Sequence, residues 1–196
     1  ETQKCEAILQ AWYPGQQGGK AVAEVLFGDY NPAGKLPVTF YRNVSQLPDF
    51  EDYNMTGRTY RYMQDVPLFP FGYGLSYTTF GYGKTVLDKN ELTAGQSLKL
   101  TVPVTNTGKR NGEEVVQVYL RKQGDAEGPI KTLRAFKRVS IPAGKTVNVE
   151  FDLKDKELEW WDDQSNTVRV CPGNYDIMVG GSSKEEDLQR TTIAIK

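Results

Sequence analysis

The segment that decides the fold of this chain is PLFPFGYGLSYTTF, residues 67–80, in which aromatic side chains stand beside glycines. Two earlier segments share this character: AWYPGQQGG at residues 11–19 and FGDYNPAGKLP at residues 27–37. Glycine permits backbone conformations that other residues avoid, and proline fixes φ and lacks an N–H donor. Rings on such rigid loops can stack on sugars, or they can pack a junction between domains. The pattern alone leaves both interpretations open.

Taken together, these segments resemble the C-terminal part of glycoside hydrolase family 3, the β-glucosidases and β-xylosidases. The matching pieces follow one another as AILQAWYPGQQGGKAVAEVLFGDYNPAGKLPVTF at residues 7–40, GRTYRY at residues 57–62 and the segment at residues 67–80. Each piece alone is weak, but the three in this order are specific. GRTYRY resembles the β-xylosidase branch more than the β-glucosidases. From about Thr85 onward the chain resembles the fibronectin type III-like domain that ends many such enzymes.

The resemblance implies a fold and an activity for the parent protein. It implies the end of an α/β sandwich domain followed by a fibronectin type III-like β-sandwich. An intact relative is a retaining exo-glycosidase that cleaves terminal β-linked sugars from oligomers of plant-type polysaccharides, and we expect a secreted or periplasmic location. The family's nucleophilic aspartate and acid/base glutamate belong to segments that precede this one, so no catalytic residue carries over. The expected partners are the N-terminal domains and, through them, the oligosaccharide substrate.

The composition excludes several other classes of function. The chain has 196 residues and no histidine, which removes Ser–His–Asp and Cys–His nucleophile systems and imidazole metal sites. Its 24 basic and 25 acidic residues give a net charge of −1, without the basic excess that a nucleic-acid surface needs. The mean hydropathy is −0.55, and no apolar run reaches the roughly 18 residues of a membrane span. Neither a metal nor an organic cofactor is expected.

The two cysteines and the start of the chain say little about its cellular compartment. Cys5 and Cys171 lie far apart in the sequence, and we interpret them as two unpaired, buried thiols rather than a disulfide. The chain starts at Glu1 without a methionine or a signal peptide, so it reads as an excised piece of a longer protein.

The distribution of aromatic residues divides the chain into two units, residues 1–84 and 85–196. The first unit holds 16 of the 22 aromatic residues. In this unit the sequence predicts a buried strand at residues 7–12 and a second strand at residues 36–41. Between them it predicts a helix at residues 18–27, capped by Gly28. One strand–helix–strand unit cannot cover both faces of a parallel sheet. The first unit is therefore predicted to be the last part of a larger α/β domain, with an exposed apolar face.

The second unit shows apolar residues with a period of two, which is typical of strands in an antiparallel sandwich. Turn signals at residues 106–108, 124, 142–144 and 171–174 separate the rows. A polar segment at residues 155–163 predicts a helical turn that ends in paired tryptophans, one of which could be a sugar platform. The rows comprise Leu98, Leu100, Val102 and Val104; Val116, Val118 and Leu120; Val147, Val149, Phe151 and Leu153; Val168 and Val170; Ile177 and Val179; and Ile193 and Ile195.

Glycoside hydrolysis usually needs two carboxyl groups about 5–5.5 Å apart when configuration is retained. The carboxylates of the first unit lie in contexts typical of turns and solvated loops, so we expect none of them to be catalytic. These candidates are Asp29, Asp49, Glu51, Asp52 and Asp65.

Four residues are candidates for binding substrate in the parent enzyme: Trp12, Arg58, Tyr60 and Arg61. The guanidinium groups of Arg58 and Arg61 are multidentate donors near tyrosines, suited to sugar hydroxyls or to a carboxylate. The competing interpretation is that both arginines form ion pairs with acidic residues across the domain junction. A second function class also stays open, namely a free-standing carbohydrate-binding or protein-interaction module without enzymatic activity.

Overall fold

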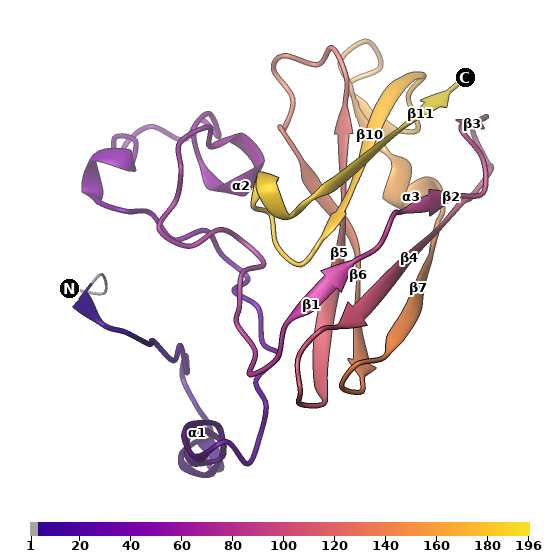
Figure 1. The fold of residues 1–196 in the computed structure, drawn as a ribbon. Helices are drawn as coiled ribbons and strands as arrows, with labels where there is room; N and C mark the ends of the chain where they lie inside the picture. Colours follow the sequence, from indigo (N-terminus) through magenta and orange to yellow (C-terminus); the bar gives the residue numbers. More distant parts are fainter. Residues whose placement is uncertain (1–3) are drawn as a thin grey trace.

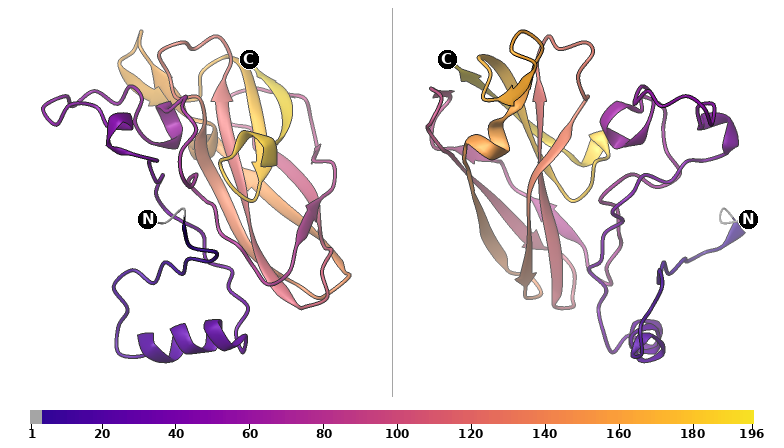
Figure 2. Two further views of the ribbon diagram at one scale, coloured as in Figure 1. Left: turned by 60° about the vertical axis from the view of Figure 1, so that its left-hand side comes forward. Right: turned by 180° about the vertical axis from the view of Figure 1, so that it is seen from behind.

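The computed structural model describes residues 4–196, in which a β-sandwich is joined to an extended N-terminal part (Figure 1). The N-terminal part runs beside one face of the sandwich, and its helix α1 (Gly18–Phe27) stands apart from both sheets (Figure 2). The short helix α2 (Thr59–Tyr62) lies near the sandwich, and the 3-10 turn η2 (Val44–Gln46) precedes it in the chain.

One sheet of the sandwich is built around the long strand β4 (Leu98–Asn106). Strand β7 (Thr146–Leu153) pairs with β4 along one edge, and β1 (Phe80–Tyr82) and β2 (Val86–Leu87) share the other edge. All of these pairs are antiparallel. Since β1 follows the aromatic segment directly, that segment is tied to the sandwich at its C-terminal end.

The second sheet has β10 and β5 at its centre, and every pair in it is antiparallel except that of β3 with β11. Strand β6 forms one edge of this sheet. The order of the strands is β3 (Glu91–Leu92), β11 (Gln189–Ile195), β10 (Gly173–Gly180), β5 (Gly112–Lys122) and β6 (Thr132–Ile141).

Short elements complete the second unit. The predicted helical turn is present as α3 (Asp155–Leu158), and the paired tryptophans that follow belong to the hairpin of β8 (Trp160–Asp162) and β9 (Thr167–Arg169). The 3-10 turn η3 (Glu185–Asp187) connects β10 to β11.

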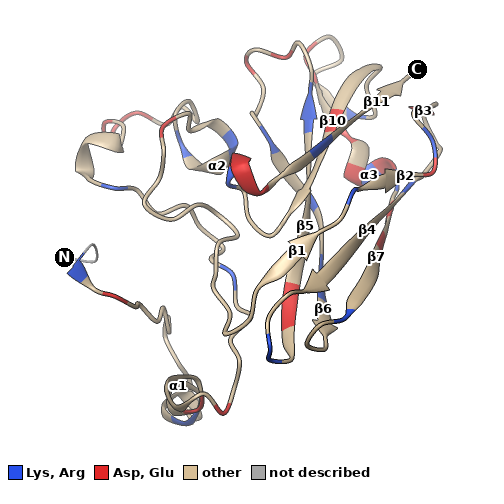
Figure 3. Cartoon of the chain, in the orientation of Figure 1, with Lys and Arg blue, Asp and Glu red and all other residues tan. Residues whose placement is uncertain are grey.

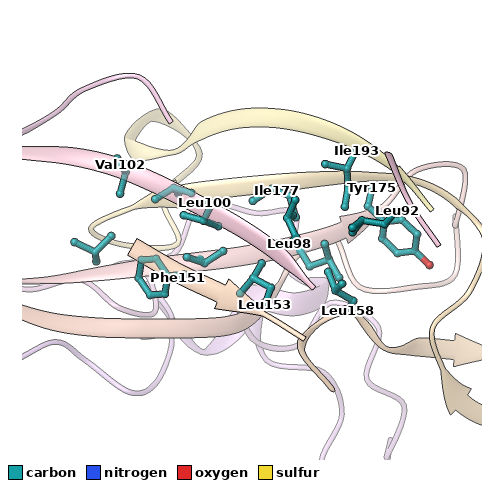
Figure 4. Close-up of a cluster of buried hydrophobic side chains, with 14 of the residues drawn as sticks. Leu92, Leu98, Leu100, Val102, Phe151, Leu153, Leu158, Tyr175, Ile177 and Ile193 are labelled. Carbon is teal, nitrogen blue, oxygen red and sulfur yellow. The ribbon is translucent and has the colours of Figure 1, made fainter. Parts of the chain in front are cut away.

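The core lies between the two sheets and is formed by the predicted apolar rows. Strand β4 buries every second side chain, which is the pattern that the period of two predicts. Residues from β4, β7, β10 and β11 meet there, together with Leu158 of α3 (Figure 4). The predicted rows of β4, β5, β7, β10 and β11 are confirmed, with Val147 only half-buried at the edge of the cluster.

Two parts of the sandwich depart from the predicted pattern. Val168 of β9 is 52% exposed, because β9 is the exposed strand of a separate two-stranded sheet, from which Trp160 of β8 reaches the core. Strand β6 has no predicted apolar row, because as an edge strand it carries exposed residues such as Phe136. Its register against β5 also shifts by one residue, since Ala135 pairs with Val118 but Leu133 pairs with Tyr119.

The predicted helix of the first unit is confirmed as α1. Gly28 ends it in the left-handed conformation, with φ at +81°, and its N–H donates to the carbonyl of Val25. Every residue of α1 is exposed or half-buried, and Phe27 is 84% exposed. The expected exposed apolar face of the first unit is therefore present.

The two strands predicted in the first unit are wrong. Residues 7–12 form no strand with any part of residues 4–196, and each of them is exposed. Residues 36–41 are extended but make only a single bridge, between Phe40 and Phe69. A strand needs neighbours to satisfy its backbone groups. The described residues supply none for residues 7–12, and residues 36–41 have only the aromatic segment beside them.

The cysteine interpretation is correct in one respect and wrong in another. Both thiols are free, but Cys5 is exposed on the N-terminal segment whereas Cys171 is buried. Among the described helices, none is long and apolar enough to cross a membrane. The division of the chain at residues 84 and 85 stays a prediction, and β1 shows that sheet pairing begins at Phe80.

Candidate functional site

The aromatic segment at residues 67–80 folds back on itself and against the outer face of the five-stranded sheet. Tyr60 stacks on Phe71 with ring centroids 4.2 Å apart, and it meets Tyr119 of β5 edge-on at 5.9 Å. Phe69 stacks on Tyr73 at 5.9 Å. These rings take one another as partners, which favours the interpretation that they pack a junction. We call the cluster of Tyr60, Phe69, Phe71, Tyr73 and Tyr119 the aromatic junction.

Backbone hydrogen bonds hold the aromatic segment to its surroundings on two sides. On the N-terminal side, Gly72 donates to the carbonyl of Leu36 at 2.7 Å, and Leu36 donates to the carbonyl of Tyr73 at 2.8 Å. On the sandwich side, Ser183 donates to the carbonyl of Phe71 at 2.9 Å. The extended residues 36–41 therefore pair with the aromatic segment rather than with a parallel sheet.

The side chain of Gln117 is the polar centre of the aromatic junction. Its amide nitrogen donates to the carbonyls of Gly72 at 3.1 Å and Gly181 at 2.6 Å, and its oxygen accepts from the hydroxyl of Tyr119 at 2.5 Å. Burial raises the pKa of the Tyr119 hydroxyl, which stays a donor. Sequence reasoning missed Gln117, because a polar residue that alternates with buried valines is usually solvent-exposed on the outer face of a sheet.

A buried ion pair lies beside the aromatic junction. The ammonium of Lys35 is 3.2 Å from a carboxylate oxygen of Glu114, and these side chains are 14% and 6% exposed. The other oxygen of Glu114 accepts from the hydroxyl of Tyr82 at 2.9 Å, and Lys35 also donates to the carbonyl of Gly74 at 3.0 Å. Burial, followed by the charge of Glu114, raises the pKa of Tyr82. This network connects three segments far apart in the sequence.

The acidic candidates of the first unit lie in turns or on exposed loops. Asp49 accepts from the N–H of Glu51 at 3.2 Å, and Asp52 accepts from the N–H of Asn54 at 2.9 Å. These hydrogen bonds to Asn54 lower the pKa of Asp52. Asp29 and Asp65 are exposed. Turns and solvent are the environments that the sequence context of these carboxylates predicts.

The two most buried carboxylates of the second unit are each neutralised by a cation. Glu114 forms the ion pair with Lys35 described above. Asp176 forms an ion pair with Arg190 at 3.4 Å, and it also accepts hydrogen bonds from Gln123 and Thr192. Within residues 4–196, no group of three histidine, cysteine or acidic side chains is arranged to hold a metal ion. Basic and acidic residues are interspersed over both parts of the chain (Figure 3).

The structure brings three of the four predicted substrate-binding residues together. Arg58 precedes α2, and Tyr60 and Arg61 belong to it. Arg58 donates to the carbonyls of Asn54 and Asp52, and Tyr60 lies in the aromatic junction. Neither Arg58 nor Arg61 forms an ion pair with an acidic side chain of residues 4–196, and their pairing across the domain junction stays a prediction.

Trp12 lies on a different part of the molecule. It is 50% exposed, with φ at +53°, on the extended segment that leads to α1, and this segment runs apart from α2 in Figure 1. A shallow apolar groove of about 160 Å³ separates that segment from α1, lined by Leu9, Ala11, Pro14, Gly18, Ala21, Val22 and Val25.

The paired tryptophans have different environments. Trp160 is buried, donates to Asp125 at 2.6 Å and meets Tyr175 edge-on at 6.1 Å, so it belongs to the core. Trp161 is 49% exposed, and its indole N–H donates to Asp163 at 2.8 Å. Only Trp161 of the pair presents a ring to solvent.

Asp162 in the β8–β9 hairpin is expected to titrate at an unusually low pH. Its carboxylate accepts from the hydroxyl of Ser165 at 2.5 Å and from Arg169 at 2.7 Å, which lowers its pKa from 3.8 to about 2. The stabilisation is present above the unfolded pKa and is lost as the pH falls towards 2. Replacing Ser165 with alanine should raise the pKa, as measured by NMR titration of the carboxyl carbon. An unchanged titration curve in this variant would contradict the assignment.

Comparison with known proteins identifies both parts of the chain. Residues 1–77 match the glycosyl hydrolase family 3 C-terminal domain, and residues 114–183 match the fibronectin type III-like domain. The chain is 55% identical over 195 residues to a xylan 1,4-β-xylosidase of Xylanibacter ruminicola, covering 100% of this chain and 22% of that protein. It is 38% identical to a periplasmic β-glucosidase of Salmonella typhimurium, covering 93% of this chain and 26% of that protein.

A solved structure agrees with the sequence matches. A β-glucosidase from Erythrobacter marinus superimposes with a TM-score of 0.85 at 42% identity, over 100% of this chain and 26% of that one. The chain thus spans about a quarter of the length of the relatives it matches. The predicted fold class, an α/β fragment followed by an all-β sandwich, is confirmed. The chain therefore carries the glycosyl hydrolase family 3 C-terminal domain over residues 1–77, followed by a fibronectin type III-like domain, and corresponds to the C-terminal region of the β-xylosidases and β-glucosidases that it matches.

Proposed function

We propose that this chain is the non-catalytic C-terminal portion of a retaining exo-β-glycosidase that releases terminal β-linked sugars, with β-xylosides as the favoured substrates. The preference for xylosides is supported by GRTYRY at residues 57–62 and by the names of two similar relatives, a xylan 1,4-β-xylosidase and a β-xylosidase from Formosa agariphila. The proposed substrates are oligomers of plant-type polysaccharides, bound mainly by the rest of the parent protein.

The observation that carries this proposal is the closure of the aromatic junction. A sugar platform needs an open ring face, whereas Tyr60, Phe71 and Tyr119 use their faces and edges on one another. The same rings, with Gln117 and the Lys35–Glu114 pair, join the first unit to the sandwich. The role that fits these contacts is to brace the sandwich against the α/β domain, so that the catalytic domains keep a fixed arrangement.

The exposed apolar surface of the first unit is the place where we propose that the rest of the parent enzyme packs. It includes Leu26 and Phe27 of α1 and Ile8, Leu9 and Tyr13 of the preceding segment. A large amount of exposed apolar surface usually marks an interface. In the parent, residues 7–12 would then find the neighbouring strands that residues 4–196 do not supply.

The chain alone is expected to hydrolyse neither aryl β-xylosides nor aryl β-glucosides. Retaining hydrolysis needs a nucleophile and an acid/base about 5–5.5 Å apart, and the five acidic candidates of the first unit serve turns or face solvent. Release of nitrophenol from the aryl glycosides would be measured for the chain, for the preceding domains and for their mixture. Activity should appear only when the preceding domains are present.

Turnover by the chain alone would contradict the proposal, provided that it is lost when one of Asp29, Asp49, Glu51, Asp52 or Asp65 is changed to the corresponding amide. Retention of that activity in every amide variant would trace it to a contaminating glycosidase and leave the chain inactive, as proposed.

A carbohydrate-binding module is the second candidate function, and the exposed ring of Trp161 favours it. Binding of xylo- or gluco-oligosaccharides to the isolated chain at millimolar or lower concentration, lost in Trp161→Ala, would support this candidate. If calorimetric titration of the chain with these oligosaccharides shows no heat of binding, the bracing role is the function that the result supports. For the cellular location, we propose a secreted or periplasmic enzyme, supported by the periplasmic relative from Salmonella typhimurium.

Two further assignments are carried forward as proposals. The first is the division into units at residues 1–84 and 85–196. The second is the contact of Trp12, Arg58, Tyr60 and Arg61 with substrate in the parent enzyme, in which Tyr60 would act through its hydroxyl, since Phe71 covers the face of its ring. Of these four, Trp12 has the most open ring, at 50% exposure.

A further inference from the structure

The free edge of strand β6 brings two arginines from distant parts of the sequence together. The carbonyl of Arg61 accepts from the N–H of Ile130 at 2.7 Å, and the hydroxyl of Tyr60 accepts from the N–H of Leu133 at 3.1 Å. These two hydrogen bonds fix α2 against the start of β6. Arg61 therefore lies beside the stretch of β6 that carries Arg134.

A β-bulge places Arg134 at this edge. Ala135 pairs with Val118 and Leu133 pairs with Tyr119, so Arg134 is the extra residue of β6 without a partner in β5. Bulges of this kind occur at sheet edges and re-aim a side chain. The guanidinium of Arg134 reaches the carbonyl of Glu159 at 2.6 Å and lies 5.6 Å from the centre of the Trp160 ring.

The guanidinium of Arg61 lies close enough to act on that of Arg134, and the carboxylate of Glu159 acts on Arg134 more weakly, from beyond ion-pair distance. Neither Arg61 nor Arg134 forms an ion pair with an acidic side chain of residues 4–196, and the nearest ring to Arg61 is that of Tyr62, at 5.5 Å. Burial and then the charge of Arg61 lower the pKa of Arg134, as expected for cations that are close together. An anion between them would relieve this repulsion.

Three polar atoms at this edge are buried without a hydrogen-bond partner in the described part of the chain. They are the Nε of Arg61, the Nε of Arg134 and the hydroxyl oxygen of Thr132. A buried donor that lacks an acceptor carries the full cost of its desolvation, so native proteins rarely leave several in one place. Two N–H donors and one hydroxyl, on residues that the contact of α2 with the start of β6 brings together beside two positive charges, match the requirements of a bound oxyanion.

We propose that Arg61, Arg134 and Thr132 form a binding site for a carboxylate group. The two oxygens of a planar carboxylate suit the two free Nε–H donors, and the hydroxyl of Thr132 adds a third hydrogen bond. A tetrahedral phosphate would bring more acceptor oxygens than these three atoms satisfy. The carboxylate comes either from an acidic side chain of a polypeptide packed on this edge or from an acidic sugar such as a uronic acid.

Titration of the chain with sodium acetate tests the site directly. Total ionic strength is kept constant with sodium chloride, and the Nε–H signals of Arg61 and Arg134 are followed in ¹H–¹⁵N spectra. Both signals should shift and saturate as acetate is added. The apparent Kd should rise at least tenfold in Arg61→Gln and in Arg134→Gln, and also in Arg61→Lys, which keeps the charge but loses the planar donor pair. Lys145→Gln, at an exposed residue away from this edge, is the matched control and should bind like the wild type.

The choice of anion separates the two sources and gives the outcomes that overturn the site. Glucuronate that binds more tightly than acetate, with no response to glucose, assigns the site to an acidic sugar. Equal binding of acetate and glucuronate assigns it to an acidic side chain. The proposal would be overturned if the Nε–H signals shifted with chloride as they do with acetate. It would also be overturned if phosphate bound more tightly than acetate. The wild-type titration decides this even if an arginine variant does not fold.

Discussion

Replacing Glu114 with alanine is expected to lower the free energy of unfolding by about 3–5 kcal/mol, the usual cost of removing one partner of a buried ion pair. The carboxylate is 6% exposed and joins Lys35, at 3.2 Å, to the hydroxyl of Tyr82, at 2.9 Å. Its loss leaves the ammonium of Lys35 with the carbonyl of Gly74 as its remaining partner in a dry setting. Most of the cost comes from that uncompensated charge.

A double-mutant cycle checks this explanation by urea denaturation. Lys35→Met removes the charge that Glu114→Ala would leave behind, so the double variant should be less destabilised than the two single variants added together. Tyr82→Phe isolates the neutral hydrogen bond and should cost about 0.5–1.5 kcal/mol. If the double variant loses as much as the sum, the pair is not coupled and the buried-charge argument fails.

Replacing Gly72 with alanine is expected to cost about 3–8 kcal/mol and to open the aromatic junction. Its φ of +77° strains any other residue by about 1–2 kcal/mol. The added Cβ would also lie 2.0 Å from the amide oxygen of Gln117. Gln117 must then move, which breaks its hydrogen bonds to Gly72 and Gly181 at about 1–3 kcal/mol for each buried group left unsatisfied.

Gly57→Ala is the matched control for this experiment. Gly57 has nearly the same φ, +72°, but a Cβ there would meet nothing within 4 Å. Its substitution should therefore cost only the backbone strain of about 1–2 kcal/mol. Denaturation curves that show equal losses for the two variants would mean that Gln117 adjusts without penalty. Near-ultraviolet circular dichroism reports whether the rings of the junction lose their order.

The sandwich could be predicted from the sequence because its strands bury alternate residues. Leu98, Leu100, Val102 and Val104 show a period of two along β4, and this period survives in the structure as a buried face. Strand β6 escaped prediction because most of its residues are half-buried or exposed and do not alternate, and because its bulge at Arg134 breaks the register.

The first unit shows why local patterns are a weaker guide when neighbours are absent. The apolar residues 7–12 carry the signal of a buried strand, but the free energy of a strand comes from the strands beside it. The helix α1, by contrast, satisfies its own backbone and is present as predicted, with its Gly28 cap. Secondary structure that depends only on nearby residues was predictable, and structure that depends on distant partners was not.

Some residues of the candidate site could be predicted from the sequence, but their arrangement in space could not. The aromatic segment, Tyr60 and Arg61 stood out by composition, and a junction was one of the two interpretations. The ion pair of Lys35 with Glu114 spans 79 positions, and in the sequence both residues look like ordinary surface charges. Arg134 gave no signal either, since a bulge is decided by the pairing of two strands and not by either strand alone.

The position of β1 has a practical consequence for anyone who dissects the protein. Because β1 hydrogen-bonds to residues 104–106, a fragment cut at Thr85 would leave that end of β4 as a bare strand edge. The same cut would uncover Tyr119 and Met178, which are fully buried in the intact chain. Such a fragment would invite edge-to-edge polymerisation. The fibronectin-like unit is therefore not an independent module that can be transferred to another protein by cutting at its sequence boundary.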